Sequence, residues 1–292
     1  MAYRVIHRTS YAYESVVSAS YGTVYLLPRE TTSQRVVSAH VDVVPAPDTL
    51  SEWTDFFGNR VANFSVLTGH TELTVTTTSV VEVAQRLLPV FGTGPTWEDA
   101  RDMVRESVEA EMLEARQFLL ASPSALTSPL VHEFAAVSFT PGRHLVDVLG
   151  DLTGRIHREF TYKPGVTELD TTPDELLALR AGVCQDFAHL QIACLRSHGI
   201  AARYVSGYLE TIAPPGKEKL RGADVSHAWV SAYLPTMGWV DLDPTNNVFV
   251  GDRHVCTAWG RDYADVSPLR GVIFTEAKSN TMTVNVDVTA EP

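Results

Sequence analysis

The first third of the chain alternates between apolar and polar residues, a pattern typical of β-strands with one buried face. Four stretches show it most clearly: YRVIHRTSYAYE, SQRVVSAHVDVVP, RVANFSVLTG and TELTVTTTSVVEV. In the second stretch, the residues expected on one face are Val37, Ala39, Val41 and Val43. The dipeptide Gly58-Asn59 separates two apolar runs and predicts a hairpin turn. We therefore expect residues 1–92 to form an all-β, sandwich-like domain.

The pattern changes after the segment FGTGPTW, whose two glycines and proline mark a boundary near residues 92–95. From there, helix-forming segments follow one another. They are preceded by Ser or Thr residues suited to cap a helix start: Thr96 before an acidic segment, Ser128 before Pro129, and Thr172 before Pro173. Glu175 follows Thr172 at the spacing of a capping box. A longer helix is expected within residues 144–162, where apolar residues recur at helical spacing.

The segment AGVCQDFAHLQIACLRSHGIAARYVSGYLE carries the most informative pattern. A helix is expected from Cys184 to His198, with an apolar stripe on one side and Gly199 as its stop. The stripe consists of Phe187, Leu190, Cys194 and Leu195. Three strands should follow, in ARYVSGYLE, SHAWVSAYLP and GWVDLDP, and the tail MTVNVDV should form one more. We therefore expect residues 93–292 to form a helical segment followed by an α+β domain with a C-terminal strand.

Between the first two of these strands lies the long segment TIAPPGKEKLRGAD, which is rich in proline, glycine and charge. Long connections of this kind beside a site often act as lids. Residues 212–224 are therefore a candidate lid for the groove next to Cys184.

Composition narrows the function without defining it. The net charge is −12 and the isoelectric point about 5.2, which argues against general binding to nucleic acid or to an anionic membrane. The start of the chain lacks the pattern of a signal peptide, and no apolar run is long enough to span a bilayer. We expect a cytoplasmic protein. The sequence does not indicate its oligomeric state.

Three cysteines are present, Cys184, Cys194 and Cys256, too few and too scattered for a disulfide framework. There is no Cys-x-x-Cys pair and no His-Glu-x-x-His segment, so we expect no metal and no cofactor. Cys184 could still be a nucleophile or a small apolar residue. Its place at a helix start, where free amides and the helix dipole favour an anion, supports a reactive thiolate.

A thiolate of this kind needs a base, and histidine is the usual one. His227 lies on a strand expected to run near the cysteine helix. The next strand offers Asp241 and Asp243, and a carboxylate there could accept a hydrogen bond from the second ring nitrogen. Alternation places both aspartates on one face, so periodicity does not choose between them.

Several coupled motifs resemble the transglutaminase-like superfamily, whose core is papain-like. They are R-x-x-G-I-x-A-R-x-V-x-G-Y from Arg196 to Tyr208, H-A-W at residues 227–229, G-W at 238–239 and D-P-T at 243–245. The β-rich first third and the segment GRDYADVSPLRGV are similar to the bacterial members. The resemblance implies Cys184 as nucleophile, His227 as general base and acid, and Asp243, rather than Asp241, as the residue that orients the imidazole.

The resemblance also suggests where an oxyanion and a substrate would bind. By position, one oxyanion donor should be the backbone amide of Cys184. The family takes a second donor from upstream in the chain, and our candidate is Tyr162. Gln185 is a candidate for contact with substrate; alternatively, it supplies a polar side chain that complements the dipole at the helix start. Trp229 either walls a substrate channel or packs in the core.

The expected function is cysteine-dependent acyl transfer at an amide or peptide bond, through a thioester. Hydrolysis by a protease or amidase is the preferred outcome. Protein-glutamine transglutaminase cross-linking is the first alternative, and a non-catalytic peptide-binding scaffold is the second. The partner would be a peptide or protein substrate, or a small amide. The calcium dependence of animal relatives is not carried over, because no matching residues are identifiable.

Overall fold

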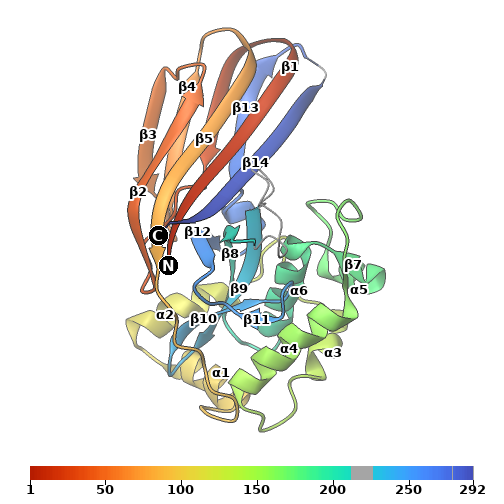
Figure 1. Cartoon of the computed structure of the whole chain (residues 1–292). Helices are drawn as coiled ribbons and strands as arrows, with labels where there is room; N and C mark the ends of the chain where they lie inside the picture. The colour runs from red at the N-terminus through yellow and green to blue at the C-terminus, as the bar shows by residue number, and fades with distance from the viewer. Residues whose placement is uncertain (212–225, 278, 292) are drawn as a thin grey trace, which may run out of the picture.

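The computed structural model describes residues 1–211, 226–277 and 279–291. A strand-rich region packs end-on against a second region, in which helices surround a smaller sheet (Figure 1). The fold is thus mixed α+β, as the sequence predicts. The proposed lid at residues 212–224 lies outside the described residues. Within the described part of the chain, no helix has the length and apolar character needed to cross a membrane.

The strand-rich region is one curled sheet built on the first strand, β1 (Ala2–Val24). Its order is β2 (Gln34–Val44), β5 (His70–Val83), β1, β4 (Arg60–Val66) and β3 (Thr49–Thr54). The register of β1 shifts near Val17, as it does at a β-bulge, so its two halves have different neighbours. The predicted turn at Gly58-Asn59 is present between β3 and β4, with Gly58 at φ 77°.

The last two strands return to this first sheet. β14 (Asn280–Glu291) pairs with residues 2–13 of β1, and β13 (Leu269–Thr275) pairs with the end of β1. The two chain ends therefore lie close together (Figure 1). The sequence predicts the tail strand but groups it with the second region, because alternation shows that a strand forms and not which edge it joins.

One predicted strand face differs from the structure at its first residue. Val41 and Val43 of β2 are buried as expected, whereas Val37 is half exposed. The register between β2 and β5 shifts between Val36 and Ser38, which is the mark of a bulge. An extra residue in a strand reverses the side on which the preceding side chains point.

The predicted helices and their caps are present in the second region. The hydroxyls of Thr96 and Ser128 each accept an N–H three residues on, and Thr172 forms a full capping box with Glu175. The helices are α1 (Trp97–Glu106), α2 (Ala110–Arg116), α3 (Pro129–Ala136), α4 (Leu145–Glu159), α5 (Pro173–Leu179) and α6 (Cys184–Ser197). The acidic segment breaks between α1 and α2, where Ser107 takes an extended backbone and its hydroxyl accepts the Glu109 N–H.

Helix α6 is the central element of this region. The four residues of its predicted stripe are all at most 2 % exposed, and Gly199 ends the helix at φ 76°. The helix packs on an antiparallel sheet of order β11 (Val248–Phe249), β10 (Gly238–Asp243), β9 (Ser226–Leu234), β8 (Ala202–Leu209) and β12 (His254–Gly260). A short parallel pair, β6 (Thr161–Tyr162) and β7 (Ala181–Gly182), leads into α6.

The two regions share buried side chains. Tyr208 of β8 is 1 % exposed and belongs to the apolar core of the first sheet, where its hydroxyl lies 3.1 Å from His7 Nδ1. Val255 of β12 enters the same core. The sheet of the second region is therefore anchored in the first sheet through two of its strands.

Gly207 of β8 lies opposite Cys256 in β12 and opposite His227 in β9. A Cβ at this position would collide with the Val255 carbonyl and would lie 2.6 Å from the Trp229 ring. Only glycine therefore allows β12 to lie this close to β8 behind the Trp229 ring.

We predict that Gly207→Ala lowers the free energy of unfolding by about 1–3 kcal/mol, because the added methyl overpacks a buried site. Denaturant unfolding followed by circular dichroism measures the change. The matched control is Gly251→Ala, where a Cβ meets nothing within 4 Å. Equal unfolding free energies for the two variants would contradict the close approach.

Candidate active site

Cys184 is the first residue of α6 and is half-buried. The turn before it is held by Asp186, whose carboxylate accepts the Val183 N–H at 2.8 Å and the Thr167 hydroxyl at 2.8 Å. This is the helix-start role that an acidic residue favours. Because Cys184 and Asp186 share the first turn, the thiol is placed on rigid backbone.

His227, in β9, brings its imidazole to Cys184. The ring interacts with Cys184, which raises its pKa, and it forms a hydrogen bond with Asp243. That hydrogen bond is between Nε2 and Asp243 Oδ2, at 2.8 Å. Since Nε2 is engaged by Asp243, Nδ1 is the nitrogen left for the thiol. The structure thus joins Cys184, His227 and Asp243 in one chain of contacts.

Asp243 ends β10 and is fully buried. Its Oδ1 accepts the backbone N–H groups of Thr245 (2.9 Å) and Asn246 (3.1 Å), as an aspartate at the start of a tight turn commonly does. The D-P-T-N segment therefore shapes its own turn. The turn leaves Oδ2 aimed at the imidazole of His227.

Two side chains that sequence reasoning missed also reach Asp243 Oδ2. The Asn246 amide donates to it at 2.7 Å, and His254 Nε2 lies 3.1 Å away. Asn246 could have been suspected from its place three residues after Asp243. His254 offered no signal, because it is a lone histidine on β12, which is not among the strands that the sequence predicts.

The charges of this cluster follow from its hydrogen bonds. Burial alone would raise the pKa of Asp243, but hydrogen bonds from His227 and His254 outweigh it and hold the pKa well below its usual range. Burial alone would lower the pKa of His227, yet the hydrogen bond with Asp243 and the interaction with Cys184 raise it well above the ordinary value. Asp243 is therefore ionised and His227 is stabilised as an imidazolium.

His254 behaves differently from His227. Burial lowers its pKa despite the opposing hydrogen bond to Asp243. An ionised carboxylate is only an acceptor, so His254 donates through Nε2. Its Nδ1 is buried and has no partner among the described residues, which is the state of a neutral ring with a bare nitrogen. His254 is therefore a neutral N–H donor to Asp243.

The atoms of His227, Asp243 and His254 that could bind a metal all lie within 4.8 Å of one another. In principle, two imidazoles and a carboxylate can hold a cation. Here Oδ2 already accepts three donors, and the two Nε2 atoms lie at hydrogen-bond distances from it. We therefore assign the cluster to hydrogen bonding.

The structure separates the two candidate aspartates. Asp241 forms an ion pair with Arg86 and accepts the Trp229 indole N–H at 3.3 Å. Burial acts to raise the pKa of Asp241, but Arg86 and Arg203 hold it below the ordinary value. Asp243 alone of the two contacts the His227 ring, which agrees with the assignment taken from the family motif.

The remaining candidates differ in placement. Tyr162 pairs with Gly182 in register, beside the start of α6, and burial together with the nearby Cys184 raises its pKa. Gln185 is half-buried in the first turn of α6. Trp229 is fully buried, with its ring edge against His254 at 5.2 Å. Trp229 packs among Val205, Val250 and Cys256, and its fully buried ring leaves no surface to wall a substrate channel.

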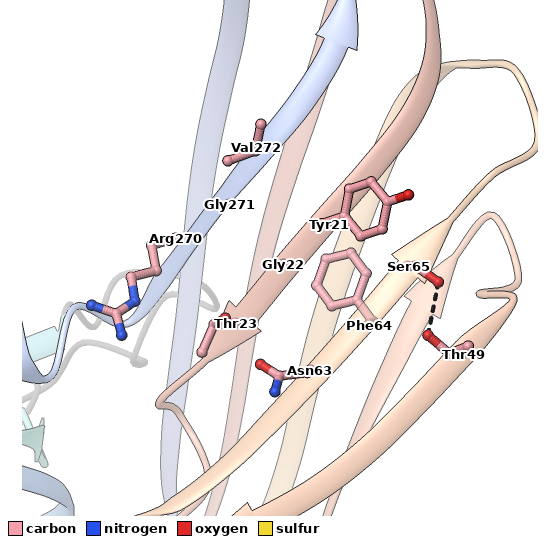
Figure 2. Close-up of a pocket in the computed structure, with 10 residues that line it drawn as sticks. All are labelled: Tyr21, Gly22, Thr23, Thr49, Asn63, Phe64, Ser65, Arg270, Gly271 and Val272. Carbon is pink, nitrogen blue, oxygen red and sulfur yellow. Dashed lines mark hydrogen bonds between the residues drawn. The ribbon is translucent and has the colours of Figure 1, made fainter. Parts of the chain in front are cut away.

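A separate pocket of about 700 Å³ lies on the first sheet, between β1, β3, β4 and β13 (Figure 2). Phe64 lies over Gly22, where a Cβ could not fit, and Arg270 stands at one end (Figure 2). No Cys, His, Asp or Glu lines this pocket. It therefore offers neither the nucleophile nor the base that the cluster at Cys184 provides.

The fold brings Cys184, His227 and Asp243 together, and comparison with known proteins gives the family of the chain. Residues 3–82 match the bacterial transglutaminase-like N-terminal region, and residues 144–244 match the transglutaminase-like superfamily. An uncharacterized protein of Mycobacterium tuberculosis is 44% identical over 294 residues, covering 98% of this chain and 92% of the relative. The chain belongs to the transglutaminase-like superfamily.

Two further relatives show how far the likeness reaches. The crystal structure of a proposed cysteine protease from Cytophaga hutchinsonii has a TM-score of 0.78, covers 100% of this chain and 92% of its own, and is 22% identical. It supports the fold of the whole chain. A protein-glutamine gamma-glutamyltransferase of Pseudomonas aeruginosa is 38% identical over 95 residues, which is 32% of this chain and 14% of that protein.

We predict that Asp243→Asn costs about 2 kcal/mol of unfolding free energy near neutral pH, because charge-assisted hydrogen bonds are lost. A carboxyl whose pKa falls on folding stabilises the fold above its unfolded-state pKa, about 4, and loses that contribution as the pH falls. The deficit of the variant should therefore shrink below about pH 4. Urea unfolding across this range measures it.

The control for this experiment is Glu72→Gln, which neutralises an exposed carboxylate on the first sheet and should leave the unfolding free energy nearly unchanged. A deficit for Asp243→Asn that stays constant down to about pH 3 would contradict an ionised Asp243.

Proposed function

We propose that this protein is a cysteine-dependent acyl-transfer enzyme that cleaves amide or peptide bonds. The observation that supports this best is the continuous chain of contacts from Cys184 through His227 to Asp243. A buried, ionised carboxylate that holds the proton on an imidazole beside a helix-start cysteine is the arrangement that favours a thiolate. A protein that only bound peptides would not need it.

In the proposed reaction the Cys184 sulfur attacks the carbonyl carbon, and the carbonyl oxygen takes up the negative charge. His227 then donates its Nδ1 proton to the leaving nitrogen as the C–N bond breaks, which gives a free amine and a thioester on Cys184. In the second half, neutral His227 takes a proton from the incoming water. The thioester breaks, a carboxylic acid leaves, and the thiolate and imidazolium return.

The oxyanion would be stabilised at the start of α6. We assign one donor to the backbone N–H of Cys184, because it belongs to the first turn, whose amides lack helical partners. Tyr162 stays our candidate for the second donor. Its place opposite Gly182 and its electrostatic coupling to Cys184 support this assignment. Gln185, one residue further along the helix, is the candidate for contact with substrate.

We propose water as the usual acceptor, which makes the protein a protease or amidase. Cys184 keeps part of its solvent exposure, so water can reach a thioester formed there. Selective transfer to an amine would instead require a site that excludes water. The local likeness to a glutamyltransferase makes protein-glutamine cross-linking the competing outcome. The proposed substrate is a peptide or protein, or a small amide, and the proposed compartment is the cytoplasm.

We predict that Cys184 reacts with iodoacetamide at about pH 6, and that His227→Ala slows this reaction on the order of a hundredfold, because an isolated thiol is almost fully protonated there. Peptide mapping by mass spectrometry measures the rate. Cys194 and Cys256 serve as internal controls: both are buried, and burial raises the pKa of Cys256 to about 11. Labelling of Cys184 no faster than these two would refute the proposed nucleophile.

We predict that incubation with a peptide library releases new amino termini, and that a labelled primary amine added in excess is not incorporated. The physical reason is access of water to the thioester. Cys184→Ser is the matched control and should abolish cleavage. Amine incorporation that depends on Cys184, without new amino termini, would replace hydrolysis by transglutaminase cross-linking.

A further inference from the structure

We propose that His254 is a positioning residue for the reaction. It lies on the edge strand β12, which the N-terminal β-region (residues 1–83) holds beside Asp243. This inference rests on the proposed acyl-transfer function. It adds a fourth side chain to the Cys184, His227 and Asp243 set. It also gives the β-region a part in the chemistry.

The contacts of Asp243 define what His254 does. Three side-chain donors converge on Oδ2, and those from His227 and Asn246 belong to β9 and to the turn after Asp243 itself. His254 alone reaches Asp243 from β12, at the far edge of the sheet. Its N–H stabilises the carboxylate as an anion and fixes the direction of Oδ2 toward His227. The anion in turn keeps the proton on His227.

The His254 ring is itself held on several sides. The Trp229 ring packs edge-on against it, with 5.2 Å between the two ring centroids, and the His254 side chain is about 5% exposed. A ring locked between buried groups keeps one rotamer, as a positioning residue requires. Within the part of the chain that the structure describes, Nδ1 has no partner, so the hydrogen bond to Asp243 is the polar contact of this ring.

β12 lies at an edge of the sheet of the second region, and two carboxamides of the N-terminal β-region cap its outer side. Gln34 donates to the Cys256 carbonyl at 2.7 Å and accepts the Cys256 N–H at 2.8 Å. Asn59 makes the same pair of hydrogen bonds with the backbone of Trp259: it donates to the carbonyl at 2.8 Å and accepts the N–H at 2.9 Å. Each amide imitates a paired strand, which satisfies an edge that would otherwise be open.

The spacing of these two contacts has a geometric cause. In a regular strand, backbone groups on one edge recur every second residue, yet Cys256 and Trp259 are three apart. The register between β12 and β8 shifts between Cys256 and Ala258, so Thr257 is the extra residue of a bulge. The bulge turns both Cys256 and Trp259 toward the β-region. Arg29, stacked on the Trp259 ring at 3.1 Å, completes this contact.

Other charged groups around the cluster act on the pH dependence too. Arg86 and Asp241 form an ion pair beside it, and Arg203 of β8 also acts on Asp241. Cys184 faces His227 from α6, and His157 of α4 bonds to the Thr245 carbonyl. None of these groups donates to Asp243 in the described residues, so the effect of His254 can be tested separately from theirs.

The test compares His254→Leu, which removes the donor, with His254→Gln, whose amide nitrogen can reach the position of Nε2. The rate of Cys184 alkylation by iodoacetamide is measured from about pH 4 to pH 8. Losing the donor frees Oδ2 to turn away from His227, so the imidazolium is less stabilised and the Cys184 thiolate forms only at higher pH. We expect the acid limb of the pH–rate profile to move up by about one pH unit in His254→Leu. At a given pH on that limb, the rate of alkylation would then be about tenfold lower. The Gln variant should restore most of it.

The outcomes separate the two proposals. If wild-type Cys184 reacts no faster than a buried cysteine, the proposed function fails, whatever His254 does. If the wild type reacts as expected and His254→Leu keeps its profile, or His254→Gln shifts as far as Leu, the positioning role is refuted. The wild-type profile is recorded with and without EDTA, and a chelator-dependent profile would also overturn the hydrogen-bonded assignment.

A measurement on the unmodified protein covers the case in which His254→Leu does not fold. Nitrogen-15 spectra of labelled histidines report which ring nitrogens carry protons, and the His254 signal is assigned by its loss in His254→Gln. We expect His254 to stay neutral from about pH 5 to pH 8, with Nε2 protonated and Nδ1 bare. A ring protonated at Nδ1 with a bare Nε2 cannot donate to Asp243 and would refute the inference.

Discussion

The second half of this protein is organised around one buried carboxylate. Asp243 has no contact with solvent, so an ion there survives only if protein donors replace water. Two backbone N–H groups of its own turn satisfy one oxygen, and three side chains satisfy the other. With fewer donors the carboxyl would take up a proton. Kept ionised, it holds the proton on His227 beside Cys184.

This constraint links parts of the fold that look independent. The donors to Asp243 come from β9, from the turn after β10 and from β12, so the sheet must hold three strands in register. β12 is an edge strand, and its outer side is occupied by Gln34 and Asn59. The N-terminal β-region thus supplies what an edge strand lacks, a partner for its backbone. Its attachment to the second region is part of the site's geometry.

Local signals were sufficient wherever the interaction is local. The helix caps at Thr96, Ser128 and Thr172 depend on residues three positions apart, and each is present. The start of α6 at Cys184 and its stop at Gly199 follow from the same kind of contact. The burial of Trp229 does not follow from local signals, because a strand pattern does not tell which face is covered by a second layer. Its ring proves to be fully buried.

The sequence by itself determined the fold class, the starts of the capped helices and the three side chains that meet at the candidate centre, because short-range spacing and coupled motifs encode them. Only the tertiary structure decided which edge the C-terminal strand joins and that His254 reaches Asp243. Both depend on pairing between residues far apart in the chain, where alternation leaves partner and register free. A lone histidine becomes informative only when the strand that carries it is placed.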